Sequence, residues 1–255
     1  MKKILLTIMT TSLVTFVGTG STMAQDDGML IIPVELYACT YNDRKDSGDL
    51  DEVVDKWNEY MDSNGNDTYA AWTLTPNYFG PNQEFDVIWM AASKNAIAMG
   101  ETADAWRADN DGIAAEFAEV LTCDGHSNFA SVNYKALPDG DPANTAVLTF
   151  SDCSYKEGAS FDAIGAAMAK WSQYLTDAGS TAGIFHWYPV WGGGGEEFSF
   201  KWLEGFANHA ELGADYERLG NGLGFVTRGR LFDHLLSCDS ARVYDARNRR
   251  SAQLR

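Results

Sequence analysis

The spacing of apolar residues switches between two periods along the chain. Residues 34–39 and 146–151 alternate apolar and polar positions, which is typical of half-buried β-strands. Residues 49–61 and 161–175 instead place apolar side chains three or four positions apart, as on one face of an α-helix. Gly179 lies just past the second of these segments, where the end of a helix favours glycine. We therefore expect each half of the chain to begin with a strand and then a helix.

The same order of elements continues through each half. Further strands are predicted over 69–76, 84–91 and 127–136 in the first half, and over 181–189, 197–203 and 240–246 in the second. A single long helix is predicted before the last strand of each half, over 103–121 and over 210–236. The predicted order in each half is therefore βαββαβ.

The two halves also match residue by residue. At an offset of 114 residues, Cys39 falls on Cys153 and Trp57 falls on Trp171; at 113, Trp89 falls on Trp202. Further matched blocks occur in the same order, and this indicates a tandem duplication. We expect a first repeat over 30–137 and a second over 144–247, with a turn-rich connection over 137–142. A basic tail over 248–255 either folds back on the acidic body or remains solvated, and we favour the second because termini are seldom ordered.

The βαββαβ order is that of a ferredoxin-like sheet with two helices on one face. With two such units in one chain, the sequence resembles the dimeric α/β-barrel superfamily in its fused form. The resemblance implies an α+β fold of two ferredoxin-like repeats packed sheet to sheet as an intrachain barrel, each shielding the open face of the other. Because the repeat is fused, a monomer is expected.

The first residues have the features of an export signal. Lys2 and Lys3 precede an apolar run over 4–17, and Thr22-Met23-Ala24 offers small residues for a signal peptidase. The run is shorter than the roughly 20 residues that a membrane-spanning helix needs. We expect a signal peptide over 1–24, cleavage after Ala24, and a soluble periplasmic or secreted protein without a membrane segment.

Four cysteines follow the predicted signal: Cys39, Cys123, Cys153 and Cys238. An even number of cysteines in an exported protein is typical of disulfides, for which three pairings exist. In the ferredoxin-like arrangement the first cysteine of each repeat ends the opening strand and the second precedes the last strand. We therefore predict Cys39–Cys123 and Cys153–Cys238; four reduced, buried thiols are the alternative. No close cysteine pair suggests zinc, so no metal site is expected.

Composition and charge exclude several classes of function. The chain has 255 residues, of which 45% are hydrophobic, so a disordered protein is excluded. The formal net charge is -17. Because phosphate backbones and anionic lipids repel such a protein, we expect neither nucleic acid nor a membrane as a partner.

A few residues are candidates for catalysis or ligand binding. His186 lies in a predicted strand among aromatic residues and is a candidate acid or base, with Glu84 and Glu197 as candidate bases at matched strand starts. A core histidine and solvated carboxylates are the alternative interpretation. A cleft that could hold a flat apolar ligand is predicted near the hairpins, from the aromatic residues Trp72, Trp187, Tyr188 and Trp191.

No cofactor is expected from the motifs. Some haem-binding members of the superfamily carry an axial histidine on a helix, and by resemblance His209 or His234 could serve that role. However, no C-x-x-C-H motif is present. Gly192–Gly195 lies between two predicted strands and is interpreted as a hairpin loop, because a phosphate site needs a following helix.

Two hypotheses about function remain open. The first is an exported protein that binds a small apolar or aromatic molecule in an aromatic-lined cleft. The second is a cofactor-free oxygenase or isomerase, or a haem-dependent enzyme, of the superfamily that the chain resembles. We favour binding because no catalytic constellation in the sequence is complete.

Overall fold

The computed structural model describes residues 31–109, 112–138, 144–252 and 254. The predicted signal peptide and most of the predicted connection between the repeats lie outside these residues. Within them, no helix is both long enough and apolar enough to cross a membrane.

Each half of the chain contributes four antiparallel strands in the same spatial order. The first half contains β1 (Ile31–Tyr41), β2 (Tyr69–Tyr78), β3 (Val87–Ser93) and β4 (Leu121–Lys135), ordered β4-β1-β3-β2. The second half contains β5 (Thr145–Tyr155), β6 (Gly183–Trp191), β7 (Phe200–Phe206) and β9 (Arg242–Arg250), ordered β9-β5-β7-β6. A short strand, β8 (Leu236–Cys238), pairs with β5.

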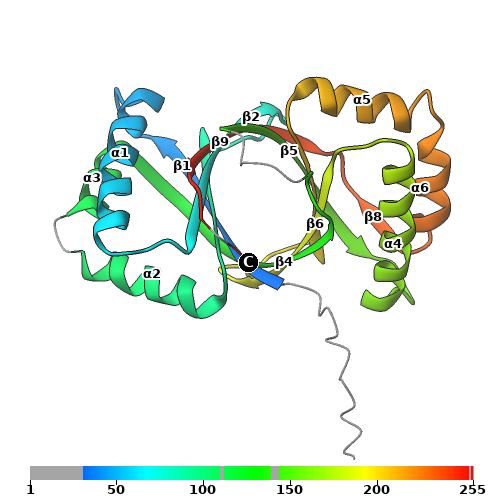
Figure 1. Cartoon of the computed structure of the whole chain (residues 1–255), viewed down its shortest axis with the longest axis horizontal. Helices are drawn as coiled ribbons and strands as arrows, with labels where there is room; N and C mark the ends of the chain where they lie inside the picture. Colours follow the sequence, from blue (N-terminus) through cyan, green and yellow to red (C-terminus); the bar gives the residue numbers. More distant parts are fainter. Residues whose placement is uncertain (1–30, 110–111, 139–143, 253, 255) are drawn as a thin grey trace, which may run out of the picture.

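The two sheets join at their edges to form a closed barrel of eight strands. β2 pairs with β9, and β4 pairs with β6, so the edge strand of one half always meets an edge strand of the other (Figure 1). Closure satisfies backbone groups that an open edge would leave unpaired. The predicted mutual shielding of the two open faces is thus achieved by joining the sheets edge to edge.

Side chains from both halves fill the barrel. The inward-facing positions of β1 are Val34 and Leu36, which alternate with residues that face the helices. The ring seen in Figure 1 is therefore a packed core. Its buried members are Val34, Leu74, Ile88, Met90, Ala92, Phe129, Phe150, Trp187, Leu203, Tyr244 and Ala246.

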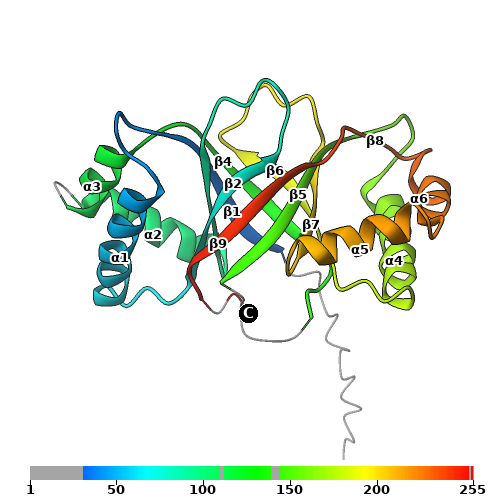
Figure 2. The same ribbon diagram turned by 90° about the horizontal axis from the view of Figure 1, so that it is seen from above.

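Three helices cover each half on the outside of the barrel. They are α1 (Ser47–Ser63), α2 (Ala96–Ala108) and α3 (Ile113–Val120) on one side, and α4 (Phe161–Asp177), α5 (His209–Leu219) and α6 (Gly224–Phe232) on the other (Figures 1 and 2). Asp46 and Ser160 cap the starts of α1 and α4 with their side chains. Gly65 and Gly179 follow these helices with φ of 63° and 74°, as the sequence predicts for Gly179.

Each long helix predicted from the sequence is in fact two shorter helices. In the first half the chain turns between α2 and α3, where the Asp109 carboxylate accepts a hydrogen bond from the Ala114 amide. In the second half Gly220 and Gly222 close α5 before α6 begins. Apolar residues recur at helical spacing on both sides of each turn, so the period alone did not reveal the break.

The strands β3 and β7 begin three residues later than predicted, at Val87 and Phe200. Glu84 and Glu197 therefore lie in the hairpins that precede these strands and are exposed. The run Gly192–Gly195 belongs to the β6–β7 hairpin, as its sequence indicated. Both hairpins project from the same end of the barrel (Figure 2).

Both predicted disulfides are confirmed. Cys39 bonds to Cys123 and Cys153 bonds to Cys238, with Cα–Cα distances of 3.9 and 4.1 Å. In each case the two cysteines lie directly opposite each other on paired strands, β1 with β4 and β5 with β8. Each disulfide therefore joins neighbouring strands at a fixed register.

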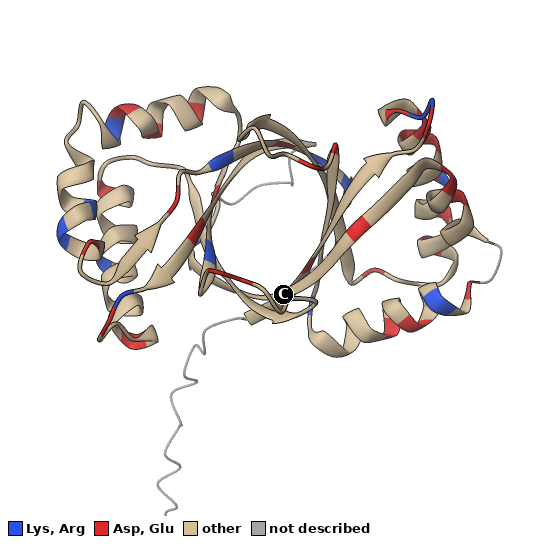
Figure 3. Cartoon of the chain, turned by 180° about the vertical axis from the view of Figure 1, so that it is seen from behind, with Lys and Arg blue, Asp and Glu red and all other residues tan. Residues whose placement is uncertain are grey.

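The prediction that the basic tail remains solvated is wrong for residues 248–250, because they form the end of β9. Backbone pairing with β2 places the arginines of β9 against the acidic helix α1 of the other half. Arg247 and Arg249 both form ion pairs with Asp51, and Arg250 pairs with Asp62 at 2.9 Å. In Figure 3 the positions of acidic residues are coloured red along the helices. Two of them on α1, Asp51 and Asp62, pair with these arginines across the boundary between the halves.

We predict that Asp51→Asn destabilises the fold by about 1–3 kcal/mol, because Arg249, only 6% exposed, then lacks a carboxylate partner. Partial burial raises the pKa of Asp51, but hydrogen bonds from Arg247 and Arg249 outweigh this, so the pKa is lowered overall. A lowered pKa stabilises the folded state above the ordinary aspartate range, and this stabilisation is lost as the pH falls through the folded pKa.

Urea unfolding at neutral and acidic pH measures this effect. Asp62→Asn is the control, since that carboxylate is 71% exposed and its partner Arg250 keeps hydrogen bonds to Asn58 and Asn66, so the loss should be less than about 0.5 kcal/mol. Equal effects of the two substitutions at neutral pH would contradict the assignment.

Candidate functional site

A cavity of about 580 Å³ lies in the first half, between the outer face of the sheet and the helices α1, α2 and α3. Seven aromatic residues line it, and Trp57 and Trp89 pack edge to face with ring centroids 5.1 Å apart. The aromatic members are Tyr37, Trp57, Tyr60, Tyr69, Trp89, Trp106 and Phe117. A cavity of this size and lining suits a small organic molecule.

The alternation of side chains along β1 places polar groups at the wall of this apolar cavity. Because side chains alternate along a strand, Glu35, Tyr37 and Cys39 share the face that looks toward the helices. Glu35 is only 8% exposed, and among the described residues Asp215 is the other buried carboxylate. A buried carboxylate is costly without hydrogen-bond donors, so its partners identify its role.

Glu35 is surrounded by donors. The Tyr69 hydroxyl donates to Glu35 Oε1 at 2.6 Å, and His126 Nε2 lies 2.9 Å from Oε2. Burial, and then the negative charge of Glu35 and a hydrogen bond to it, raise the pKa of Tyr37 and of Tyr69. Both phenols therefore stay protonated and available as donors well above neutral pH.

His126 is held between Glu35 and Tyr37. Its ring stacks on the Tyr37 ring with centroids 3.8 Å apart and an interplanar angle of 10°. An ionised carboxylate only accepts hydrogen bonds, so Nε2 carries the proton that it donates to Glu35. In the neutral ring Nδ1 is then an acceptor, and the described residues make no hydrogen bond to it. A histidine oriented by a carboxylate in this way can take up and return a proton.

The second half lacks this cluster at the corresponding positions. The offset between the halves places Thr149 at the position of Glu35 and Ser151 at that of Tyr37. Strand pairing places Ser127 opposite Leu36 and Arg242 opposite Phe150, so Ala241 corresponds to His126. The candidate chemistry is therefore a property of the first half alone.

The structure does not bring the three predicted catalytic residues together. His186 is fully buried among aromatic rings, with Tyr134, Phe200 and Trp202 at centroid distances between 4.3 and 4.9 Å. Burial lowers the pKa of His186 to about 3, so its ring is neutral. Glu84 and Glu197 are exposed in separate hairpins, whereas His186 has no exposed surface.

The four aromatic residues predicted to form a cleft are also distributed over different surroundings. Trp72 and Trp187 pack in the barrel interior, whereas Tyr188 faces the helices of the second half. Trp191 is 65% exposed at the end of β6. An aromatic-lined cavity exists in the first half, but none of these four residues lines it.

The histidines expected from haem-binding relatives do not fit a haem site. His209 is at the start of α5, and its Nε2 pairs with Asp245 at 2.6 Å on the surface. His234 is exposed in the turn after α6, and neither residue lines the cavity. His126 does line it, but its Nε2 is engaged by Glu35 and one ring face is covered by Tyr37. Haem therefore has no part in the chemistry proposed below.

The sequence did contain a signal for the cluster. Alternation along β1 groups Glu35 and Tyr37 with Cys39, and the predicted disulfide brings Cys123, three residues before His126, beside them. What the sequence could not show is the cavity. Its volume depends on how three helices pack over the sheet.

Comparison with known proteins identifies the fold of this chain. No protein-family model matches the sequence, and no curated protein matches it. A solved chlorite dismutase-like protein is similar in structure, with 13% identity, a TM-score of 0.52, and coverage of 86% of this chain and 94% of that one. A heme-binding protein from Thermus thermophilus has 8% identity, a TM-score of 0.49 and coverage of 86% and 91%.

An anthrone oxidase-like protein has 10% identity, a TM-score of 0.48 and coverage of 88% and 96%. At such identities a likeness shows the fold alone, and we rely only on the first of the three, whose TM-score exceeds 0.5. The chain has the dimeric α/β-barrel fold, as the order of its elements suggested. The fold does not specify an activity.

We predict that Glu35→Gln changes the tautomer of His126. The amide can donate a hydrogen bond to Nε2, which a carboxylate cannot do, so the ring proton shifts toward Nδ1. The ¹⁵N chemical shifts of the His126 ring measure this directly. Glu204→Gln in the second half is the control, because its carboxylate accepts from Trp202 Nε1 and is remote from His126. An unchanged His126 spectrum in Glu35→Gln would contradict the pairing.

Proposed function

We propose that this chain binds a small, flat, largely apolar molecule with an acidic O–H or N–H group in the cavity of the first half. The observation that carries the proposal is the Glu35–His126 pair at the wall of an aromatic-lined cavity. An apolar wall binds the body of the ligand, and a few placed polar groups fix its orientation.

The free Nδ1 of His126 is the acceptor for the acidic group of the ligand. Glu35 lies behind the ring, orients it and stabilises positive charge that develops on it. The phenols of Tyr37 and Tyr69 hold the Glu35 carboxylate in place. Trp57 and Trp89 supply ring faces and edges against which a flat molecule packs.

Proton transfer is the second candidate function, favoured by the same pair. His126 Nδ1 would accept a proton from an acidic carbon or oxygen of the bound molecule and return one to the same or another position. This is the chemistry of a cofactor-free isomerase, and it needs no further reactant. Glu35 would stabilise the imidazolium formed after the first transfer.

The compartment, the tandem duplication and the oligomeric state of the protein are proposed on separate grounds. Two disulfides support an oxidising compartment, in agreement with a signal peptide and with a periplasmic or secreted protein. The identical strand order of the two halves supports the tandem duplication. Pairing of the edge strands within one chain supports a monomer, because no edge of the ring is left for a second copy.

We predict that 2-naphthol binds more tightly than 2-methoxynaphthalene, which has a similar body but no O–H donor. The expected difference is about tenfold in Kd, since one hydrogen bond contributes about 1 kcal/mol or somewhat more. His126→Ala should abolish the difference and leave weak binding of both compounds. Quenching of tryptophan fluorescence or calorimetry measures the affinities.

His209→Ala is the matched control for the binding experiment, because this histidine also pairs with a carboxylate but lies at the surface. It should leave both affinities unchanged. Equal affinities of the two compounds in the unaltered protein would overturn the proposed recognition of an acidic group.

Proton transfer is tested with 2-tetralone, a flat ketone with acidic C–H bonds. In heavy water the protein should speed the exchange of the C1 protons for deuterium, followed by NMR, and His126→Ala should remove the acceleration. An acceleration that persists in His126→Ala would exclude His126 as the base. Binding without any acceleration would leave ligand binding as the function.

A further inference from the structure

A second cavity, of about 280 Å³, lies at the end of the barrel where the β2–β3 hairpin meets the second half. We propose that it binds a small aromatic monocarboxylate, whose carboxylate contacts Lys201 and Arg242. The proposal does not depend on the function proposed for the first-half cavity, because the two cavities share no lining residue.

The strands of the second half direct positive charge into the end of the barrel. Side chains alternate along a strand, so Lys201 on β7 faces inward with the core residue Leu203. On β9, Arg242 faces inward with the core residue Tyr244. Both cations line the cavity.

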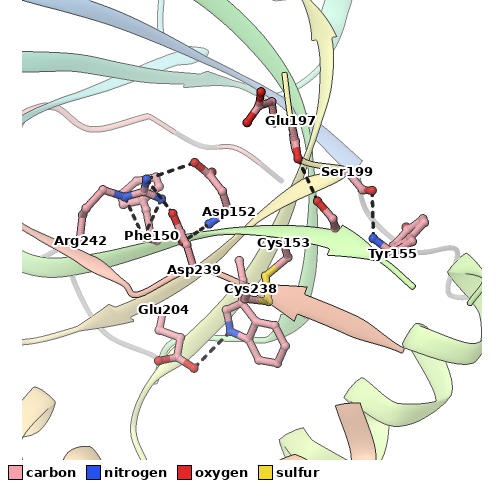
Figure 4. Close-up of a disulfide and its surroundings, with 12 residues drawn as sticks. Phe150, Asp152, Cys153, Tyr155, Glu197, Ser199, Glu204, Cys238, Asp239 and Arg242 are labelled. Carbon is pink, nitrogen blue, oxygen red and sulfur yellow. Dashed lines mark hydrogen bonds and ion pairs between the residues drawn. A yellow bond between two sulfur atoms is a disulfide. The ribbon is translucent and has the colours of Figure 1, made fainter. Parts of the chain in front are cut away.

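Two aspartates pair with these cations but do not line the cavity. Lys201 Nζ lies 2.6 Å from Asp152 Oδ1, and Arg242 Nη1 lies 3.1 Å from Asp152 and 3.2 Å from Asp239. The Arg242 guanidinium also donates to the carbonyl oxygen of Phe150, as Figure 4 shows. A ligand in the cavity therefore meets the positive groups and not the negative ones.

Hydrogen-bond donors remain available at this wall. An ammonium group has three N–H donors, so Lys201 keeps two after its bond to Asp152. Tyr244 also lines the cavity, and its hydroxyl group has no hydrogen-bond partner among the described residues. A carboxylate has only acceptors, and its hydrogen bonds to a charged donor are the strong kind.

Aromatic rings line the same cavity and suit a flat ligand. Phe85 and Tyr244 stack with centroids 6.5 Å apart, and Phe150 packs edge to face on Tyr244 at 5.4 Å. Phe85 comes from the first-half hairpin, which also contributes Asn82 and Gln83, so both halves form the site. The volume lies near the lower limit of ligand cavities, roughly 300–1,000 Å³, and favours a single aromatic ring.

Stability does not explain charges at this position. The side chains of Lys201, Asp152 and Arg242 are between 18% and 29% exposed, and partly desolvated ion pairs contribute little net stability. At the matched positions the first half has Ile88 for Lys201 and Ala38 for Asp152. Apolar residues are therefore sufficient to close a barrel end, and the charges in the second half favour a ligand.

The charge of the surroundings limits the ligand to a monoanion. The two cations are balanced by the two aspartates, so the network carries no net charge. Glu84 and Glu197 are exposed in the hairpins at this end of the barrel and repel a second negative charge. A single carboxylate uses the available donors without that penalty.

The experiment compares benzoate with benzamide, which has the same shape without the charge, by calorimetry on the folded protein. We expect benzoate to bind about tenfold more tightly, and Lys201→Met to remove this preference. Tyr244→Phe should weaken benzoate several-fold. Lys45→Met is the matched control, because Lys45 also pairs with an aspartate but lines neither cavity; it should leave the Kd of benzoate unchanged.

Near-ultraviolet circular dichroism establishes that the variants are folded. Tyr244→Phe removes a hydroxyl group that holds no partner, so it decides the matter if Lys201→Met does not fold. The proposal is overturned if benzoate does not bind, if benzamide binds equally well, or if both variants, or Tyr244→Phe alone when Lys201→Met is unfolded, bind benzoate as the unaltered protein does.

Nuclear Overhauser effects from the benzoate ring locate the ligand. We expect contacts with the rings of Phe85 and Tyr244; contacts with Trp57 or Trp89 instead would place benzoate in the first-half cavity and overturn the second site. The outcome is separable from the proposed function, since failure of 2-naphthol to bind concerns the first-half cavity alone.

Discussion

The pairing of β2 with β9 and of β4 with β6 is the interaction on which the rest of the structure depends. Without it, each half would expose one face of its sheet and two strand edges to water. With it, the inner faces become one core and every helix is confined to the outside. The cavity is a consequence, because in the first half the helices cover the sheet without filling the space over Glu35. The same pairing brings the β6–β7 hairpin of the second half against His126.

The two halves differ in what their outer cores contain. In the second half the space between sheet and helices is filled by aromatic rings around His186. In the first half a cluster of a carboxylate, two phenols and an imidazole lines a cavity. The second half thus has a packed aromatic core, while the first half has a cavity lined by a polar cluster. The barrel makes this possible, since its interior is stabilised by residues from both halves.

Much of the fold could be predicted from the sequence, because local periodicity is strong and the residues of the two halves match in order. Trp57 and Trp171 mark matched helices, and the four cysteines mark matched strand ends, so the order of elements and both disulfides followed. Helix breaks at Asp109 and Gly220 were missed because apolar spacing continues across them. The sequence favoured His186 as a site because its neighbours in the chain are aromatic. In the structure aromatic rings pack against the imidazole and leave it without exposed surface. Glu35 and His126 are 91 residues apart, and only the register of β1 with β4 shows that they meet.

The most direct test of the account is a crystal structure of the protein soaked with 2-naphthol. The account predicts the naphthalene ring between the helices and the sheet of the first half, with its oxygen within hydrogen-bond distance of His126 Nδ1. A naphthol found beside His186, at the exposed hairpins, or in the first-half cavity with its oxygen turned away from His126 would contradict it.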